Sequence, residues 1–181
     1  MTARNDVYGD VGFSEVLVAK GPCQELADEL HLFGQFVGSW SLDWIGRGPK
    51  SQREPMTGEL HFGWVLEGRA VQDVWIVPGR GQVREPDQHI GFHGSTVRFY
   101  DADLGAWRST WIEPFKGVVR RFIGKPVAND IVLVSDEETP QLRWRFTQIS
   151  ETSFVWLGET SYDRGETWEL EEEMRATRLS P

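Results

Sequence analysis

The chain has 181 residues and a formal net charge of −9, from 19 Lys and Arg against 28 Asp and Glu. That length fits a single domain, and no apolar run reaches the roughly 18 residues that a bilayer-spanning helix needs, so we expect no membrane partner. The acidic balance without a basic cluster excludes nucleic acid as the main partner, and the lone Cys23 together with an N-terminus lacking a secretory signal predicts a cytoplasmic protein.

The chain begins with a predicted arm over 1–21 and a predicted helix over 22–36. The arm combines three glycines and mixed charge with one brief apolar patch, so we expect it to be loosely attached. Pro22 suits the first turn of a helix. Apolar residues then recur at spacings of four and three, at Leu26, Leu30 and Phe33. This period predicts one amphipathic helix that Gly38 ends and that plugs or flanks the following domain.

The remainder of the chain is a series of short β-type runs separated by turn residues, which is typical of an antiparallel all-β domain. About ten runs are predicted, at 38–47, 57–66, 69–78, 94–101, 106–113, 117–124, 129–135, 141–148, 152–161 and 167–178. Most connections are too short for crossover helices, so sequential runs should pair up-and-down. The longest irregular segment, 79–93, is either a loop over a binding site or plain exposed chain.

Ten antiparallel strands lie in a sandwich or close into a barrel. Several runs alternate large aromatic residues with polar ones, and an up-and-down barrel leaves no unpaired edge. We therefore expect an all-β fold, an up-and-down antiparallel β-barrel of about ten strands with one N-terminal helix, in a single domain over 22–181.

Four short motifs along the chain resemble those of a known superfamily. They are Gly38-Ser39-Trp40, Val65-Leu66-Glu67-Gly68-Arg69, Arg98-Phe99-Tyr100-Asp101 and Ser161-x-Asp163-x-Gly165-x-Thr167-Trp168. The first resembles the opening of the calycins, which include lipocalins, fatty-acid-binding proteins and nitrobindins. The ordered set resembles a lipocalin-like bacterial domain of unknown function over about 33–178. The resemblance implies a calycin barrel with an internal cavity and an inward Trp40, and it implies no particular reaction.

The segment 161–168 also matches the Asp-box pattern S-x-D-x-G-x-T-W, which in sialidase propellers is a hairpin clasp. In such a clasp the Ser and Asp side chains bind turn amides, Gly adopts a positive φ, and Trp packs beneath the turn. A propeller needs several copies and the chain has one, so we predict a structural hairpin.

Histidines offer little support for a metal or haem site. The four are His31, His61, His89 and His93. In an extended strand the last two would lie about 13 Å apart, too far to share a zinc ion. A haem-binding barrel of the nitrobindin type would need one proximal His from among His61, His89 and His93. However, the nitrobindin opening Gly-x-Trp-x-Gly-x-Gly is absent here, so we predict no metal and no cofactor.

Nucleophilic and nucleotide chemistry also lack their motifs. Cys23 has no adjacent base in sequence, and the nucleophile elbow Gly-x-Ser-x-Gly is absent. The glycines at 46–48 are not followed by a helix pattern, and Gly-Lys-Ser/Thr does not occur.

Charged and aromatic residues share strand faces in three consecutive runs, because side chains alternate along a strand. The shared-face sets are Asp73 with Trp75, Arg98 with Tyr100, and Trp107 with Ser109, Trp111 and Glu113. If these faces point inward, Asp73, Arg98 and Glu113 meet in a pocket with Trp75, Tyr100 and Trp111. Such a pocket suits an organic ligand with a ring system and one polar group.

Alternation identifies residues that share a face, and it leaves open which face is inside. The alternative is that the charges face solvent and the tryptophans are ordinary core. With Trp40 inward by resemblance, Leu42 and Trp44 should be core, while Ser41 and Asp43 face water. Tryptophans with apolar neighbours are assigned to the core: Trp44, Trp64, Trp144 and Trp156. Those beside charged or hydroxyl groups are the ligand candidates: Trp75, Trp107 and Trp111. The acids Glu169, Glu171 and Glu173 are expected in solvent.

Three functions fit these features. The first is binding of a small apolar or aromatic ligand in the barrel cavity. The second is a lipocalin-like cyclase, isomerase or lyase in which Asp73 or Glu113 transfers a proton and Arg98 stabilises negative charge. The third is an interaction protein whose packed barrel has no cavity and whose exposed tryptophans form a homodimer contact. We favour the first.

Overall fold

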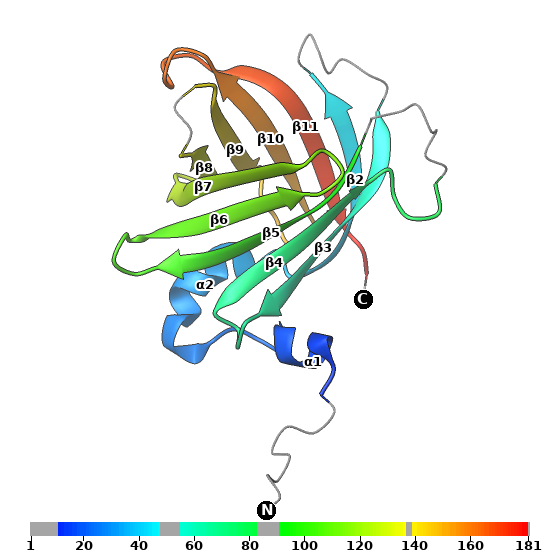
Figure 1. The fold of residues 1–181 in the computed structure, drawn as a ribbon, viewed down its shortest axis with the longest axis vertical. Coiled ribbons are helices and arrows are strands. Elements are labelled where there is room, and N and C mark those ends of the chain that lie inside the picture. The colour runs from blue at the N-terminus through cyan, green and yellow to red at the C-terminus, as the bar shows by residue number, and fades with distance from the viewer. Residues whose placement is uncertain (1–10, 48–54, 83–90, 137–138, 181) are drawn as a thin grey trace, which may run out of the picture.

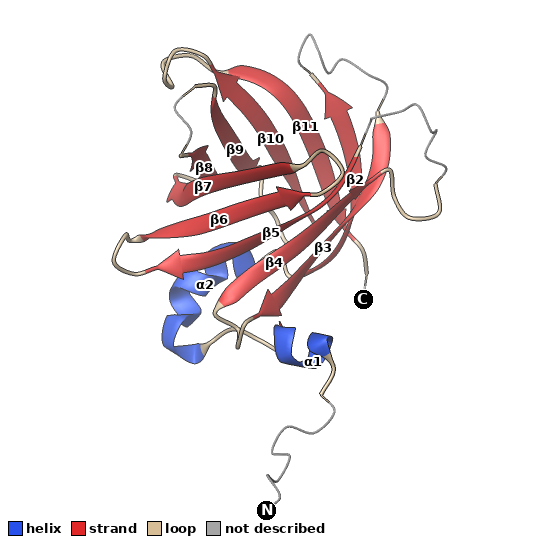
Figure 2. Cartoon of the chain, viewed as in Figure 1, coloured by secondary structure: helices blue, strands red, loops and turns tan. Residues whose placement is uncertain are grey.

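The computed structural model describes residues 11–47, 55–82, 91–136 and 139–180, and it shows a closed barrel of antiparallel strands with helices at one end (Figure 1). Ten strands, β2 to β11, each pair with their sequence neighbours, and β11 pairs back onto β2 to close the sheet. Strand is the dominant secondary structure of the chain (Figure 2). The predicted all-β up-and-down barrel is confirmed.

The barrel strands lie close to the ten predicted runs. They are β2 (Gly38–Gly46), β3 (Met56–Val65), β4 (Ala70–Val77), β5 (Phe92–Asp101), β6 (Ala106–Glu113), β7 (Val118–Val127), β8 (Asp130–Ser135), β9 (Gln141–Thr147), β10 (Ser153–Ser161) and β11 (Glu169–Arg178). The reason is visible in β9, where Leu142, Trp144 and Phe146 are buried and the residues between them are half-buried. One face of each strand thus faces the interior.

The predicted helix over 22–36 is wrong in its length and its continuity. The chain forms a short 3₁₀ helix, η1 (Gln24–Leu26), followed by α2 (Ala27–Gly34). Leu26 leaves the helical region, with φ −124° and ψ 23°, which separates the two pieces. Gly34 lies against the Trp64 ring, where a Cβ would overlap the indole, and the chain turns from there into β2. No helix among the described ranges is long and apolar enough to cross a membrane.

Part of the predicted N-terminal arm is ordered against the barrel. Residues of this arm form α1 (Phe13–Leu17) and the two-residue strand β1 (Val18–Ala19). Val18 and Ala19 pair with the end of β3, beyond the part of β3 that β2 covers. The helix itself buries none of its residues, and Phe13 is 77% exposed. The arm therefore contacts the barrel through backbone pairing rather than through an apolar core.

Helix α2 closes one end of the barrel, as Figure 1 shows. Its Phe33 ring lies 4.8 Å from the Trp107 ring, and the Phe36 ring just after the helix lies 4.8 Å from the Phe154 ring. The Trp40 Nε1–H donates a hydrogen bond of 2.8 Å to the Phe36 carbonyl. The short helix therefore acts as an apolar plug, in line with its predicted position.

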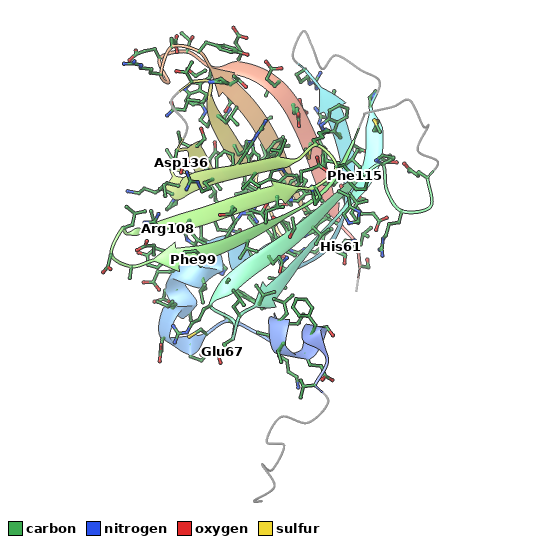
Figure 3. The ribbon with its side chains drawn as sticks, in the orientation of Figure 1. His61, Glu67, Phe99, Arg108, Phe115 and Asp136 are labelled. Atoms are coloured by element: carbon green, nitrogen blue, oxygen red, sulfur yellow. The ribbon has the colours of Figure 1, made fainter. Side chains whose placement is uncertain are left out.

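The strand faces agree with the inward Trp40 that the calycin resemblance implies. Trp40, Leu42 and Trp44 are at most 6% exposed, whereas Ser41 and Asp43 are exposed. Outward side chains on other strands include His61, Phe99 and Arg108 (Figure 3). The interior of the barrel is thus fixed at every strand, and with it the residues that line any cavity.

Candidate functional site

The end of the barrel away from α2 holds a cavity of about 270 Å³. Residues of β4 to β7 and β9 to β11 line it, together with Lys116 in the β6–β7 turn, and α2 contributes none of the described lining residues. We call this part of the interior the open end. The part filled by α2 and the aromatic side chains around Phe33 and Phe36 is the packed end.

Four tryptophans form the wall of the cavity. Their rings contact one another in sequence: Trp75 to Trp156 at 5.7 Å, Trp156 to Trp144 at 5.4 Å, and Trp144 to Trp111 at 6.0 Å between centroids. The Phe92 ring continues the row at 6.2 Å from Trp111. An aromatic surface of this kind supplies apolar contact area and ring-edge interactions to a flat organic molecule.

Two glycines within strands make room for these indoles. At Gly94 in β5 an added Cβ would run into the Trp111 ring. At Gly158 in β10 an added Cβ would lie 2.8 Å from the Trp156 ring. Glycine inside a strand often marks such a close approach. These two positions were a signal in the sequence that Trp111 and Trp156 lie flat against the barrel wall.

Asp73 and Arg98 meet inside the barrel, as predicted. They are 0% and 1% exposed, and Arg98 Nη1 donates a hydrogen bond to Asp73 Oδ2. Asp73 Oδ1 also accepts from the Thr96 amide at 3.0 Å. The guanidinium lies 5.0 Å from the centre of the Phe33 ring at the packed end. Arg98 reaches the cavity surface and Asp73 does not, so Asp73 positions Arg98 and is poorly placed to transfer a proton to a ligand.

Several polar atoms beside this pair have no hydrogen-bond partner in the described part of the chain. They are Arg98 Nε, Thr96 Oγ1 and Ser109 Oγ. Arg98 and Ser109 are cross-strand partners on β5 and β6. A buried polar group without a partner costs about 1–3 kcal/mol, so this layer favours water or a polar ligand atom at the floor of the cavity.

Glu113 also faces inward and lines the cavity, being 2% exposed. Its carboxylate accepts hydrogen bonds from the backbone amides of Phe115 at 3.0 Å and Lys116 at 2.8 Å. These bonds hold the β6–β7 turn at the cavity mouth. The predicted acid–base role is therefore less favoured for Glu113, because both oxygens are used by the turn.

Glu172 and Arg120 line the cavity and are absent from the predicted site. Glu172 Oε2 accepts a hydrogen bond of 3.3 Å from Trp44 Nε1, and its withdrawal from water raises its pKa, although Trp44, Lys116 and Arg120 oppose the increase. Glu172 lies two positions before the buried Met174, and residues two apart in a strand share a face. This spacing could have identified Glu172 from the sequence. Arg120 likewise lies two positions before the buried Phe122 and shares its face of β7.

The packed end, not the cavity, contains two of the predicted ligand residues. Trp107 is 2% exposed and packs on Phe33, and the Tyr100 ring lies 6.2 Å from the Trp107 ring. Of the predicted set, the cavity wall includes Trp75, Arg98, Trp111 and Glu113. Conversely, Trp144 and Trp156 were assigned to the core and line the cavity. Both are buried, as predicted, and they belong to the core and to the cavity wall at once. Residues on one face differ in their distance from α2, which alternation does not report.

The histidines that the structure describes do not point into the barrel. His61 lies on the outer face, where its Nδ1 is 2.9 Å from Ser39 Oγ and its Nε2 is 3.1 Å from Glu59 Oε2. His93 is exposed, and His89 falls outside the described residues. Neither His61 nor His93 is placed to ligate haem in the cavity. Within the ranges that the structure covers, no group of three or more His, Cys, Asp and Glu side chains is arranged for a metal ion.

The hairpin between β10 and β11 has the predicted structural role. Asp163 accepts from the Thr167 amide at 2.8 Å and from the Thr167 hydroxyl at 2.5 Å, and Gly165 donates its amide to Ser161 at 2.8 Å. The Ser161 hydroxyl in turn donates to Asp163 Oδ1 at 2.7 Å. The two bonds from Thr167, followed by the bond from Ser161, lower the pKa of Asp163 to about 2. Gly165 has φ +90°, as the clasp requires.

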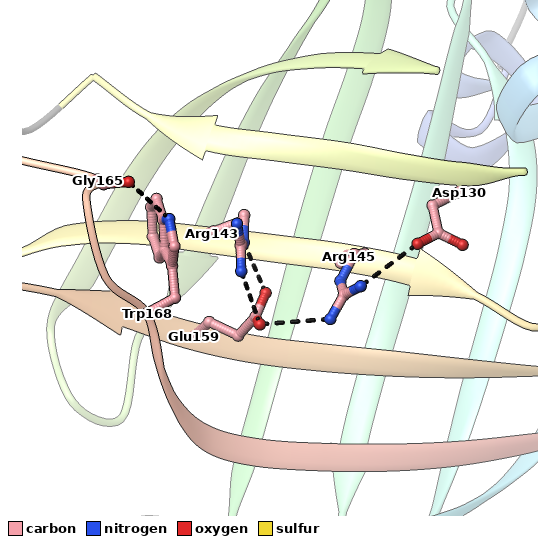
Figure 4. Close-up of polar contacts among 6 residues, drawn as sticks. All are labelled: Asp130, Arg143, Arg145, Glu159, Gly165 and Trp168. Atoms are coloured by element: carbon pink, nitrogen blue, oxygen red, sulfur yellow. Dashed lines mark hydrogen bonds and ion pairs between the residues drawn. The ribbon is translucent and has the colours of Figure 1, made fainter. Parts of the chain in front are cut away.

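This hairpin continues into a charged network on the outer face, shown in Figure 4. Trp168 Nε1–H donates to the Gly165 carbonyl at 3.0 Å, and the Arg143 guanidinium lies 4.2 Å from the Trp168 ring. Glu159 pairs with Arg143 at 2.7 Å and with Arg145 at 3.3 Å. Arg145 also pairs with Asp130 of β8 at 3.5 Å. These ion pairs therefore link β8, β9 and β10 on the outer face.

The tryptophans also decide against the packed-barrel hypothesis. All nine lie in the described ranges, six of them buried and three half-buried, so no tryptophan is exposed to form a dimer contact. The barrel also contains a cavity.

Glu173, expected in solvent, is 8% exposed and pairs with Arg47 at 2.8 Å and Arg175 at 2.7 Å.

Solved structures share this fold. An S-type phycobiliprotein lyase from Guillardia theta superposes with a TM-score of 0.55 at 13% identity, covering 83% of this chain and 92% of the lyase. The protein Rv2717c from M. tuberculosis superposes with a TM-score of 0.58 at 13% identity, covering 85% of this chain and 99% of that one. At 13% identity these likenesses show that the barrel fold is shared. No protein-family model matches the sequence, and a search of curated proteins finds no match.

Proposed function

We propose that the protein binds a small organic ligand with one or two aromatic rings in the cavity at the open end. The observation that carries the proposal is the continuous wall of Trp75, Trp156, Trp144 and Trp111 around about 270 Å³ of space. Ligand sites commonly have volumes of about 300–1,000 Å³, so this cavity suits a compact molecule rather than a long chain.

The interior charges give the ligand an orientation. Arg98 lines the cavity and is held by Asp73, Glu113 holds the β6–β7 turn, and Arg120 and Glu172 also line the cavity. A few polar groups among aromatic side chains are typical of sites that bind a ring system with a polar substituent. The cytoplasmic location and the homodimer stay predictions from the sequence.

A second candidate function is catalysis of a cyclisation, isomerisation or lyase reaction in the same cavity. One observation favours it: Glu172 lines the cavity, and burial raises the pKa of its carboxyl, as in many groups that act as general acids or bases. In this version Glu172 replaces Asp73 and Glu113 as the proton-transferring residue, because those two carboxylates are held by Arg98 and by turn amides. The fold shared with a lyase supports keeping this candidate.

A thermal-shift series with one-ring and two-ring aromatic compounds tests ligand binding. We expect saturable stabilisation by members of the series, and an affinity about tenfold lower in Trp111→Ala, because one face of the cavity loses its ring contacts. Trp168→Ala, which removes an indole from the outer hairpin, is the matched control and should bind with unchanged affinity. Stabilisation by none of the compounds, or equal losses in both variants, would contradict the proposal.

A further inference from the structure

Arg120 is a charged group on the cavity wall that has no hydrogen-bond or ion-pair partner among the residues that the structure describes. It lies on β7 opposite Trp111 of β6, it is half-buried, and it lines the cavity. Its guanidinium makes no hydrogen bond or ion pair with any residue in the described part of the chain. The adjacent Arg121, in contrast, points outward and pairs with Asp136 at 3.0 Å. A half-buried guanidinium carries five donors, which favour a planar anion such as a carboxylate.

Three of the other charges around the cavity, Arg98, Glu113 and Glu159, are held by neighbouring groups. Arg98 is neutralised by Asp73, and Glu113 is held by two backbone amides. The Lys116 ammonium, in the β6–β7 turn, is exposed and lies 5.8 Å from the centre of the Phe92 ring. Glu159 of β10 faces its two arginines on the outer surface.

On the side of β11, Glu171 and Glu172 line the cavity next to each other. Glu172 is fixed by Trp44 of β2, and it interacts electrostatically with Arg120, Lys116 and Glu171. Among the described residues, the cavity wall therefore includes a cation, Arg120, that forms no ion pair, and a buried acid, Glu172, that interacts with it electrostatically.

We propose that the ligand is an aromatic acid, that Arg120 of β7 binds its acidic group, and that the Glu172 carboxylate competes with that group for Arg120. This inference rests on the proposed function, since it names the ligand class of the same cavity. The four indoles take the ring, Arg120 takes the anion, and the state of Glu172 sets how strongly the anion is held.

The competition makes binding depend on pH. When Glu172 is protonated, the ligand anion meets only the positive charge of Arg120 and Lys116. When Glu172 is ionised, it repels the anion and attracts Arg120. Burial raises the pKa of Glu172, and a bound anion disfavours its ionisation further, so binding takes up a proton. The affinity for an anion should therefore fall as pH rises through this titration, by at most about tenfold per pH unit.

A matched pair of probes tests the inference: 2-naphthoate and its uncharged analogue 2-naphthamide, titrated by calorimetry from about pH 5.5 to 8.5, where naphthoate is ionised. At the acid end we expect naphthoate to bind about tenfold more tightly than naphthamide, as a charge-assisted hydrogen bond allows. This preference should disappear in Arg120→Gln and persist in Arg121→Gln, its neighbour on the outer face. Arg120→Lys keeps the charge and loses the planar guanidinium. Its preference for naphthoate should therefore be intermediate between those of Arg120→Gln and Arg121→Gln.

The pH arm uses Glu172→Gln, with Glu169→Gln as the control on the exposed part of β11. We expect the affinity of Glu172→Gln for naphthoate to be independent of pH, whereas that of wild type falls as pH rises, and we expect naphthamide binding to be independent of pH in every variant. Equal affinity for the two probes, or a preference unchanged in Arg120→Gln, overturns the inference and leaves the proposed function standing. Binding of neither probe overturns the proposed function itself. Unfolding curves for each variant show whether it is folded.

Discussion

The two ends of the barrel interior place charged groups in opposite situations. At the packed end, the Asp73–Arg98 pair is nearly inaccessible to solvent and is enclosed by β-strands and the Phe33 ring. At the open end, Arg120 has no partner and Glu172 is bound only through one indole N–H in the described contacts. From this difference we infer that the inward charges near α2 have a structural role and that Arg120 and Glu172 are placed to face a ligand. Glu113 is the exception at the open end, because turn amides hold its carboxylate.

Among substitutions of the inward charges, we expect the largest loss of stability at the packed end. In Asp73→Ala the Arg98 guanidinium stays buried without its counter-ion, and the Thr96 amide loses its acceptor. We expect the free energy of unfolding in urea to fall by about 3–5 kcal/mol. Adding Arg98→Met should restore part of this loss, because the uncompensated charge is then removed. A single Asp73→Ala variant as stable as wild type would show that the pair is not structural.

At the open end, removing a charge should increase the free energy of unfolding rather than lower it. Burial raises the pKa of Glu172, so its contribution to stability is greatest at low pH and is lost as pH rises through the folded-state pKa. Glu172→Gln cannot ionise and keeps an acceptor for Trp44. We therefore expect its free energy of unfolding to exceed that of wild type at about pH 8 and to approach it at about pH 4. A loss of stability at pH 8 would place Glu172 with the structural charges.

The smallest effect is expected outside the barrel interior, at the β10–β11 hairpin. Hydrogen bonds, led by those of Thr167, hold the pKa of Asp163 at about 2. Because this pKa is lowered, the stabilisation is complete above the ordinary pKa of about 3.9 and is lost as pH falls through 2. The stability difference between wild type and Asp163→Asn should be constant above about pH 5 and shrink toward pH 2. Asp103→Asn, in an exposed turn, should show no such change.

The fold was predictable because its signals are local. Glycine- and proline-containing turns separate runs of alternating side chains, and antiparallel neighbours need no long crossover, so strand positions and order follow from the chain itself. The helix was less predictable, because its end is set by the contact of Gly34 with Trp64, thirty positions away in sequence. A helical period in the sequence does not report such a tertiary contact.

The candidate site was predictable only in part. Alternation grouped Asp73, Arg98 and Glu113 with their aromatic neighbours, and all of these faces do point inward. It could not give the height of each residue in the barrel, so Trp107 was grouped with the cavity and Trp156 with the core. At the top of β11 the register with β10 shifts near Glu159, which ends strict alternation among the consecutive glutamates. Arg120 was missed because it stands next to Arg121 and only the fold separates their faces.

The most direct test of the ligand-facing open end is the indole N–H region of an NMR spectrum during titration with 2-naphthoate. The nine tryptophans give one resonance each, assigned through single Trp→Phe variants. We predict shifts for Trp75, Trp111, Trp144 and Trp156, with a further shift of Trp44 as Glu172 takes up its proton, and none for Trp107 or Trp168. Shifts confined to Trp107 or Trp168, or no shift at saturating probe, would contradict the assignment of the open end as the binding site.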